Sequence, residues 1–268
     1  MDLTRAIKRG ELRLAYQPKL HLRSRRIVSL EALVRWQHPE RGLILPGEFI
    51  PAAEETDDIL ALTLWVIERA IIDQRALGTC GHDLPIFVNI AAILLANEAF
   101  IQQACAMVLA GNTNIGFEIT ETSVIRDPEK GIANLKHVAD LGIAIAIDDY
   151  GAGLSSLAYL KQMPACELKI DKLFITQLTS SHRDPLIVRS TIDLAHAMEM
   201  EVVAEGIESE TALALLSVMG CDMAQGFLIS KPLDVGGIRT FLDQHRDGWI
   251  ADENCGALTR LTSVLKRA

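Results

Sequence analysis

The stretch Ile143-Ala144-Ile145-Ala146-Ile147-Asp148-Asp149 decides the fold, because an unbroken apolar run ends there in two acidic residues. Such a run is typical of a β-strand buried on both faces, as in a parallel sheet covered by helices. The residues before it, 128–141, follow a helical pattern that opens at Asp127-Pro128 and stops at Gly142. A helix followed by a buried strand is the repeating unit of an α/β protein.

The same unit recurs along the chain in both directions. We expect further buried strands at residues 85–91, 115–120, 166–171, 201–206 and about 223–229. We expect helices at residues 59–77, 98–109, 128–141, 185–198, 211–219 and 236–245. This alternation predicts a mainly parallel sheet with helical crossovers.

The first two extended segments, residues 12–22 and 27–36, differ from the rest. Only a short basic turn separates them, so they should form an antiparallel hairpin. With the hairpin, the chain has about eight strands, the number that closes a TIM barrel. A doubly wound sheet is the competing fold, but its GxGxxG turn after the first strand is missing. We therefore predict an α/β fold, a modified TIM (β/α)8 barrel with the first strand antiparallel.

Length and patterning favour one main domain. The chain has 268 residues, 49% of them hydrophobic, and no Pro-, Gly- or Ser-rich linker divides it. We place the domain at residues 1–245. For the tail, residues 246–268, we predict a helix, because Leu258, Leu261 and Leu265 fall on one helical face.

Composition narrows the class of function. The net charge of −9 disfavours DNA binding through basic residues, and divalent cations would have to reverse the local sign for an anionic substrate. The five cysteines are scattered without a CxxC pair, which is typical of reduced thiols in a cytoplasmic protein. The apolar stretches are too short to span a bilayer, so we expect no membrane segment here.

Polar residues interrupt the apolar strands near their carboxyl ends. They are Glu31, Asn89, Glu118, Asp148, Asp149, Lys169, Glu205 and Gln225. Any one of them alone is explained by an ordinary cap or a surface group. In a barrel, however, these strand ends converge on one mouth, and several buried carboxylates in one place require cations. Their oxygen ligands suit Mg²⁺ or Mn²⁺.

The chemistry of such a site fits hydrolysis. Two hard cations can hold a phosphoryl oxygen and lower the pKa of a bound water. Glu205 would then orient or deprotonate the water, and Lys169 would offset charge in the transition state. A barrel glycosidase with two of the carboxylates as acid and nucleophile is an alternative, disfavoured by the excess of hard ligands and by the lysine.

The ordered set of motifs resembles the EAL family of cyclic di-GMP phosphodiesterases over about residues 3 to 243. The matching segments are Tyr16-Gln17-Pro18, Glu31-Ala32-Leu33-Val34-Arg35-Trp36, Pro46-Gly47-Glu48-Phe49-Ile50, Val88-Asn89-Ile90, Glu118-Ile119-Thr120-Glu121, Asp148-Asp149, Lys169-Ile170-Asp171, Ala204-Glu205-Gly206-Ile207-Glu208 and Gln225-Gly226-Phe227. Each motif alone is weak evidence, whereas the ordered set is very specific.

The resemblance implies a TIM barrel with one antiparallel strand and hydrolysis of cyclic di-GMP to linear pGpG. It implies a metal site of two Mg²⁺ or Mn²⁺ ions, with these ligands: Glu31, Asn89, Glu118, Asp148 and, at the second ion, Asp149. It implies that Lys169 and Glu205 position and activate the water. It also implies a homodimer and, in many relatives, an upstream sensory or GGDEF domain that this chain does not include.

Three further residues would contact the dinucleotide by the same resemblance: Gln17, Arg35 and Gln225, with Arg35 on a phosphate. Glu121 would anchor the loop after Asp149 without touching substrate. That loop departs from the family pattern at Tyr150, Ala152 and Leu154. These changes leave open an alternative, a catalytically weak or inactive EAL domain that acts as a cyclic di-GMP receptor or protein-interaction module.

Overall fold

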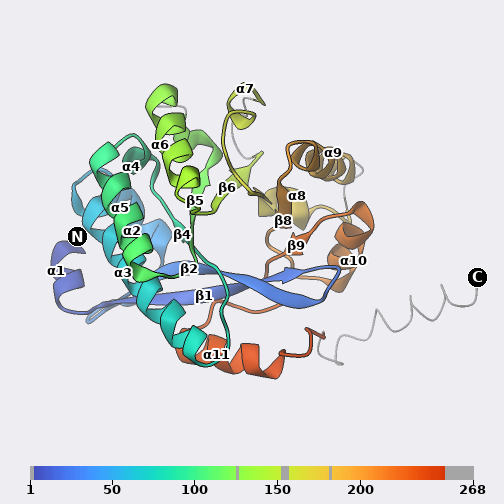
Figure 1. Ribbon diagram of the computed structural model, residues 1–268. Coiled ribbons are helices and arrows are strands. Elements are labelled where there is room, and N and C mark those ends of the chain that lie inside the picture. Colours follow the sequence, from blue (N-terminus) through green and yellow to red (C-terminus); the bar gives the residue numbers. More distant parts are fainter. Residues whose placement is uncertain (1–2, 125–126, 152–156, 181–182, 251–268) are drawn as a thin grey trace, which may run out of the picture.

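The computed structural model describes residues 3–124, 127–151, 157–180 and 183–250. Within these residues, eight strands close into a barrel in the order β1-β9-β8-β7-β6-β5-β4-β2, and β2 pairs back with β1 (Figure 1). The barrel strands are β1 (Leu12–His21), β2 (Arg26–His38), β4 (Ile86–Asn89), β5 (Ile115–Thr120), β6 (Ile145–Tyr150), β7 (Glu167–Ile170), β8 (Glu201–Ala204) and β9 (Met223–Ala224).

The first strand runs against both of its neighbours. It pairs antiparallel with β2, from Leu12 opposite Trp36 to His21 opposite Arg26, and antiparallel with β9. The neighbouring pairs from β2 through β4 to β9 are parallel. A short strand, β3 (Gly42–Ile44), adds to the end of β2. The fold predicted from the sequence is therefore confirmed, including the reversed first strand.

Helices surround the barrel (Figure 1). They are α1 (Leu3–Lys8), α2 (Pro46–Glu54), α3 (Asp58–Thr79), α4 (Ala92–Leu95), α5 (Glu98–Gly111), η1 (Glu121–Val124), α6 (Pro128–Asp140), α7 (Leu157–Leu160), α8 (Lys172–Thr176), α9 (Asp184–Ala197), α10 (Glu210–Met219) and α11 (Val235–Gln244). Among the described residues, none of these helices combines the length and apolar character needed to cross a bilayer.

Local sequence explains where several helices begin and end. The Asn97 side chain accepts a hydrogen bond from the Phe100 N–H at the start of α5, and Asp127 does the same for Lys130 at the start of α6. The α10 helix ends at Gly220, whose φ of 84° is the left-handed conformation common after a helix. By contrast, Ala91 precedes α4 without a capping side chain, as its residue type predicts.

The core lies between the barrel and its helices. Strand residues that face outward are apolar and buried, for example Val88, Phe117 and Ile147. Their neighbours along each strand face the barrel interior, because side chains alternate across a strand. Polar residues on that inner face, such as Glu118 next to Phe117, are thereby held inside the barrel. This alternation positions the functional site.

Most of the predicted strands are shorter in the structure; β4, for example, was expected at residues 85–91 and spans Ile86–Asn89. The strand expected at residues 143–149 begins at Ile145, and the one expected at 223–229 ends at Ala224. After Ala224 the chain turns to run along Ile207, which donates to the Gln225 carbonyl and accepts from the Leu228 N–H. Gly226 permits this approach, since a Cβ there would lie 2.2 Å from backbone atoms of Ile207. The turn leaves Gln225 at the barrel mouth.

The helical tail predicted for residues 246–268 rests on residues 251–268, which lie outside the described part of the chain. Residues 245–247 form a turn, residues 248–250 have no regular secondary structure, and Trp249 is buried.

Candidate active site

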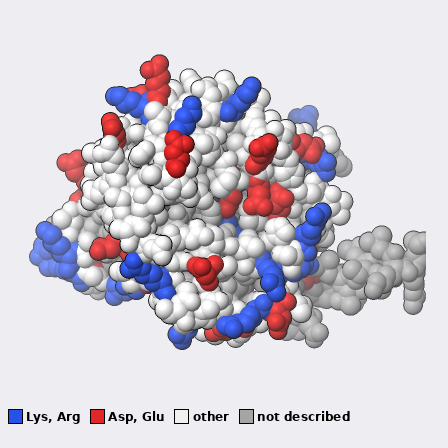
Figure 2. All heavy atoms as spheres, viewed as in Figure 1, with Lys and Arg blue, Asp and Glu red and all other residues white. Residues whose placement is uncertain are grey.

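Three strands bring three buried carboxylates together at the mouth. Glu31 comes from β2, Glu118 from β5 and Asp148 from β6, and one oxygen of each lies within 4.8 Å of the other two. Asp148, Asp149 and Glu205 form a second group by the same criterion. The two groups therefore share Asp148. Figure 2 shows red carboxylate side chains gathered near the centre of the face in view.

An irregularity in β6 explains why Asp148 and Asp149 both serve the mouth, although successive strand residues face opposite sides. The pairing of β6 with β7 shifts register between Ile147 and Tyr150, which places the two aspartates in a bulge. Asp149 has a φ of 54°, a left-handed conformation uncommon for residues other than glycine. Its N–H donates to Asp148 Oδ1 at 2.8 Å. The backbone is thus bent at the point where the two acidic groups meet.

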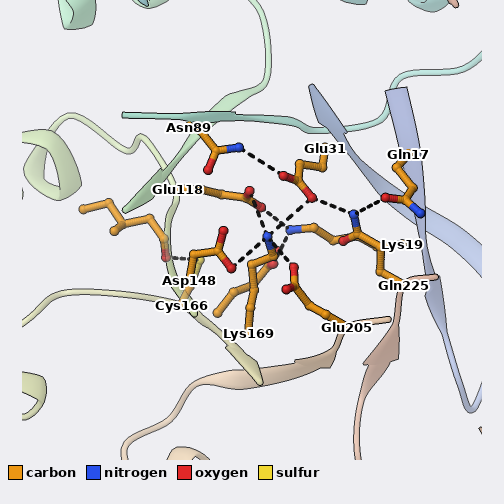
Figure 3. Close-up of polar contacts among 12 residues, drawn as sticks. Gln17, Lys19, Glu31, Asn89, Glu118, Asp148, Cys166, Lys169, Glu205 and Gln225 are labelled. Atoms are coloured by element: carbon orange, nitrogen blue, oxygen red, sulfur yellow. Dashed lines mark hydrogen bonds and ion pairs between the residues drawn. The ribbon is translucent and has the colours of Figure 1, made fainter. Parts of the chain in front are cut away.

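Lys169, on β7, stands at the centre of the carboxylates (Figure 3). Its Nζ lies 2.7 Å from Glu205 and 3.1 Å from both Glu118 and Asp148. Glu31 is 3.4 Å away. The lysine is fully buried. The ammonium group of Lys169 therefore faces four carboxyl groups.

The pKa values reflect this arrangement. Burial acts to raise the pKa of Glu118, but Lys169 and Lys19 outweigh it and hold that pKa at about 2. Burial raises the pKa of Glu31, and it raises that of Glu205 to about 8. Burial and the neighbouring Asp148 raise the pKa of Asp149 to about 6. Glu31, Asp149 and Glu205 thus resist ionisation without additional positive charge.

Amide side chains border the carboxylates. Asn89 Nδ2 donates to Glu31 Oε1 at 3.0 Å, which leaves the Asn89 oxygen to face the mouth. Gln225 Nε2 donates to Glu31 Oε2 at 2.6 Å and lies 3.2 Å from Gln17 Oε1. Gln225 Oε1 is buried and has no hydrogen-bond partner among the described residues.

The model of the EAL domain family matches residues 1–232 of the chain. The chain belongs to the EAL domain family. It is 37% identical over 236 residues to the bifunctional diguanylate cyclase/cyclic di-GMP phosphodiesterase MucR of Pseudomonas aeruginosa, covering 87% of this chain and 34% of that protein. It is also 37% identical to the cyclic di-GMP phosphodiesterase NbdA of the same organism, covering 91% of this chain and 32% of that protein. The chain thus spans about a third of the length of these curated relatives.

Solved structures agree with this assignment. The PaMucR phosphodiesterase in complex with c-di-GMP is similar with a TM-score of 0.84 and 36% identity, covering 88% of this chain and 98% of that one. The EAL enzyme Bd1971, in a form with cAMP and cyclic di-GMP bound, is similar with a TM-score of 0.85 and 33% identity, covering 90% and 67%. These likenesses extend over nearly the whole EAL domain.

The donor set of this EAL domain fits hard divalent cations. Among the described residues, the mouth gathers the Asn89 amide and five carboxylates, from Glu31, Glu118, Asp148, Asp149 and Glu205, around Lys169, and Lys19 contacts Glu118 from below. Oxygen donors in this number suit a hard divalent cation better than a soft metal. The sequence prediction of converging polar strand ends is confirmed by these distances.

Arg35 and Glu121 lie beside the cluster. Arg35 is half-buried on β2 and donates to the Val34 carbonyl at 2.9 Å. Burial lowers its pKa, and the nearby Glu31 carboxylate opposes this shift. Glu121 accepts a hydrogen bond from the Gly151 N–H at 3.3 Å, which ties the beginning of the loop after Asp149. The altered positions Ala152 and Leu154 in that loop lie outside the described residues.

Sequence reasoning missed three residues at or below the mouth. Lys19 and Glu167 are buried inside the barrel and lie 2.6 Å apart. Each is two residues from an identified site residue, Gln17 or Lys169, so strand alternation was a usable signal. Phe227 follows Gln225 and is 56% exposed, which is unusual for a phenylalanine beside a polar site.

Proposed function

We propose that this EAL domain hydrolyses cyclic di-GMP to linear pGpG, with Mg²⁺ or Mn²⁺ as its cofactor. The observation that carries the proposal is the pair of acidic groups that share Asp148, set between two cavities. Similarity to relatives named as cyclic di-GMP phosphodiesterases, and to a solved complex with c-di-GMP, supports the choice of substrate.

The cavities match a ligand with two bases. One, of about 480 Å³, is lined by Glu31 and Asn89 and has apolar walls that include Leu33 and Ile50. The other, of about 330 Å³, is lined by Glu31, Asp148, Glu205, Gln225 and Phe227, among others. Both reach Glu31. A substrate with a base in each cavity would therefore place a phosphodiester over the carboxylates.

The residues present would hold two cations. Glu31, Asn89, Glu118 and Asp148 would bind one, and Asp149 would bind the second beside the shared Asp148. When bound, these ions supply positive charge at the phosphoryl oxygens and lower the pKa of water. The raised pKa values of Glu31, Glu205 and Asp149 support this assignment, because each group gains from a cation nearby.

The other residues would carry the proton transfer and orient the substrate. Glu205 would accept a proton from the attacking water while the water oxygen forms a bond to phosphorus. One P–O bond of the ring breaks, and the proton passes to the departing oxygen. Lys169 would stabilise the charge on the phosphoryl oxygens.

Gln17, Arg35 and Gln225 would contact the dinucleotide, with Arg35 on a phosphate. Glu121 would hold the loop after Asp149, consistent with its contact to Gly151.

We further propose that residues 1–245 act as one catalytic domain of a cytoplasmic homodimer, in some proteins behind a sensory or GGDEF domain. Neither DNA nor a membrane is proposed as a partner of this segment. Light scattering of the purified chain tests the homodimer.

Cyclic di-GMP turnover, resolved by chromatography, tests the function. The wild-type protein should produce pGpG with Mg²⁺ or Mn²⁺ and none with a chelator. Glu31→Ala should abolish turnover while remaining folded, and Glu48→Ala, an exposed glutamate on α2, should keep it. Tight binding of cyclic di-GMP without hydrolysis in either metal would refute the enzyme and favour the receptor alternative. Full turnover by Glu31→Ala would refute the assignment of the site.

A further inference from the structure

A buried ion pair lies one layer below the mouth, inside the barrel. Lys19, on β1, is fully buried, and its Nζ is 2.6 Å from Glu167 on β7. The same Nζ lies 3.9 Å from the centroid of the Phe87 ring. Barrel interiors are mainly filled by branched apolar side chains, so an ion pair here is unusual.

Stability alone does not account for this pair. Taking two charges out of water costs several kcal/mol per ion by rough estimate, and well-packed apolar residues of similar volume often serve as well or better. A neutral layer would therefore close the barrel interior equally well. An apolar side chain at this position, however, would not make the charged contact that Lys19 makes with Glu118.

Lys19 reaches upward to the mouth as well as across to Glu167. Its Nζ lies 2.8 Å from Glu118 Oε1, whereas Lys169 approaches the other oxygen, Oε2, at 3.1 Å (Figure 3). Each oxygen of this fully buried carboxylate thus has its own ammonium group. Lys169 is shared with the other acidic residues of the mouth, while Lys19 holds Glu118 from below.

The strand pairing beside Lys19 is irregular. Ser29 lies opposite Lys19 and Ile27 lies opposite Leu20, which leaves Val28 of β2 as an extra residue. Irregularities of this kind are common next to active sites. Glu167, one pleat below Lys169 on β7, supplies the opposite charge that keeps the Lys19 side chain in the barrel interior.

We propose that Lys19 is a positioning residue for the metal-binding carboxylate Glu118, and that Glu167 fixes Lys19 in that role. The inference rests on the proposed function, because it assumes that Glu118 binds a cation. Partners behind a metal ligand fix its orientation, and their loss typically weakens metal affinity by about 10–100-fold.

Mn²⁺ binding to the metal-free protein, measured by calorimetry without substrate, tests the inference. Lys19→Met should bind Mn²⁺ about 10–100-fold more weakly than the wild type. Tyr16→Phe is the matched control: it lies on the same strand, is equally buried and loses a hydrogen bond to Asp73 instead. It should lower the melting temperature and leave Mn²⁺ affinity unchanged.

The double variant Lys19→Met/Glu167→Gln separates positioning from simple charge balance, and it covers the case in which Lys19→Met does not fold. It removes both charges, so it should fold with near wild-type stability, yet its Mn²⁺ affinity should remain low. Wild-type Mn²⁺ affinity in this variant, or in a folded Lys19→Met, would overturn the inference alone. Absence of Mn²⁺ binding by the wild-type protein would overturn the proposed function, and the inference with it.

Discussion

Lys169→Met tests whether this lysine acts as an internal cation for the mouth. Its ammonium group lies within 3.4 Å of Glu31, Glu118, Asp148 and Glu205. Removing one partner of a buried ion pair costs about 3–5 kcal/mol, because the remaining charge is left uncompensated. For a domain of this size, about 2–4 °C of melting temperature corresponds to 1 kcal/mol. We therefore expect Lys169→Met to melt about 6–20 °C lower than the wild type in a chelator.

Divalent cations should shrink this difference, since a bound ion supplies the positive charge that the variant lacks. In the chelator, a lower pH should also reduce the difference in melting temperature between Lys169→Met and the wild type. The carboxylates of the folded variant then have raised pKa values, so the folded state binds more protons than the unfolded state and gains stability as the pH falls.

Thermal unfolding followed by circular dichroism measures both effects, with and without Mn²⁺, at pH 8 and pH 6. Arg41→Met is the control, because Arg41 forms an exposed ion pair with Glu48 at 3.2 Å. Arg41→Met should lower the free energy of unfolding by at most about 1 kcal/mol, with or without metal. An equal difference between Lys169→Met and the wild type in chelator and in Mn²⁺ would refute the reasoning.

Three further predictions concern the ligands of the mouth. Phe227→Ala should weaken cyclic di-GMP binding in calorimetry by about 1–3 kcal/mol through loss of base stacking, at an unchanged melting temperature; an unchanged Kd would contradict a stacking role. Asp149→Asn should stay folded, since asparagine tolerates the left-handed backbone, but should bind one Mn²⁺ fewer by electron paramagnetic resonance; full stoichiometry would exclude Asp149 as a ligand. Burial raises the pKa of Glu205 to about 8. Mn²⁺ affinity should therefore increase from pH 6 to pH 8, and binding should release protons. A pH-independent affinity would show that no such proton is displaced.

Most of the barrel could be predicted from the sequence because the buried strands are mainly apolar and several helices have local start or stop signals. The strand at Ile115–Thr120 and the start of the helix at Pro128 agree with the prediction to the residue. The end of β9 could not be predicted in this way. The apolar residues after Gln225 resemble a strand, but their turn depends on contact between Gly226 and Ile207, which are far apart in the sequence.

The site residues likewise divide into those that local sequence predicts and those that depend on contacts between distant segments. Glu31, Glu118 and Asp148 were predictable because a charged residue within an apolar strand is costly and therefore conspicuous. Lys19 was harder to predict, because its segment alternates in polarity as a half-exposed strand does, and its spacing of two residues from Gln17 was the available signal. Only the closure of the barrel shows that its inner face is buried. The bulge that brings Asp149 to the mouth likewise depends on the pairing of β6 with β7.

The reversed first strand has a consequence for the route of the chain. In a regular barrel of parallel strands, the first strand enters from the face opposite the active site. Here Leu12 lies opposite Trp36, beyond Glu31 on β2, so the chain enters β1 from the catalytic side. The helix before it, α1, lies against the start of α3 on that side, where Thr4 donates to Asp58. The segment that leads into β1 therefore reaches the rim of the mouth directly, without passing through the barrel.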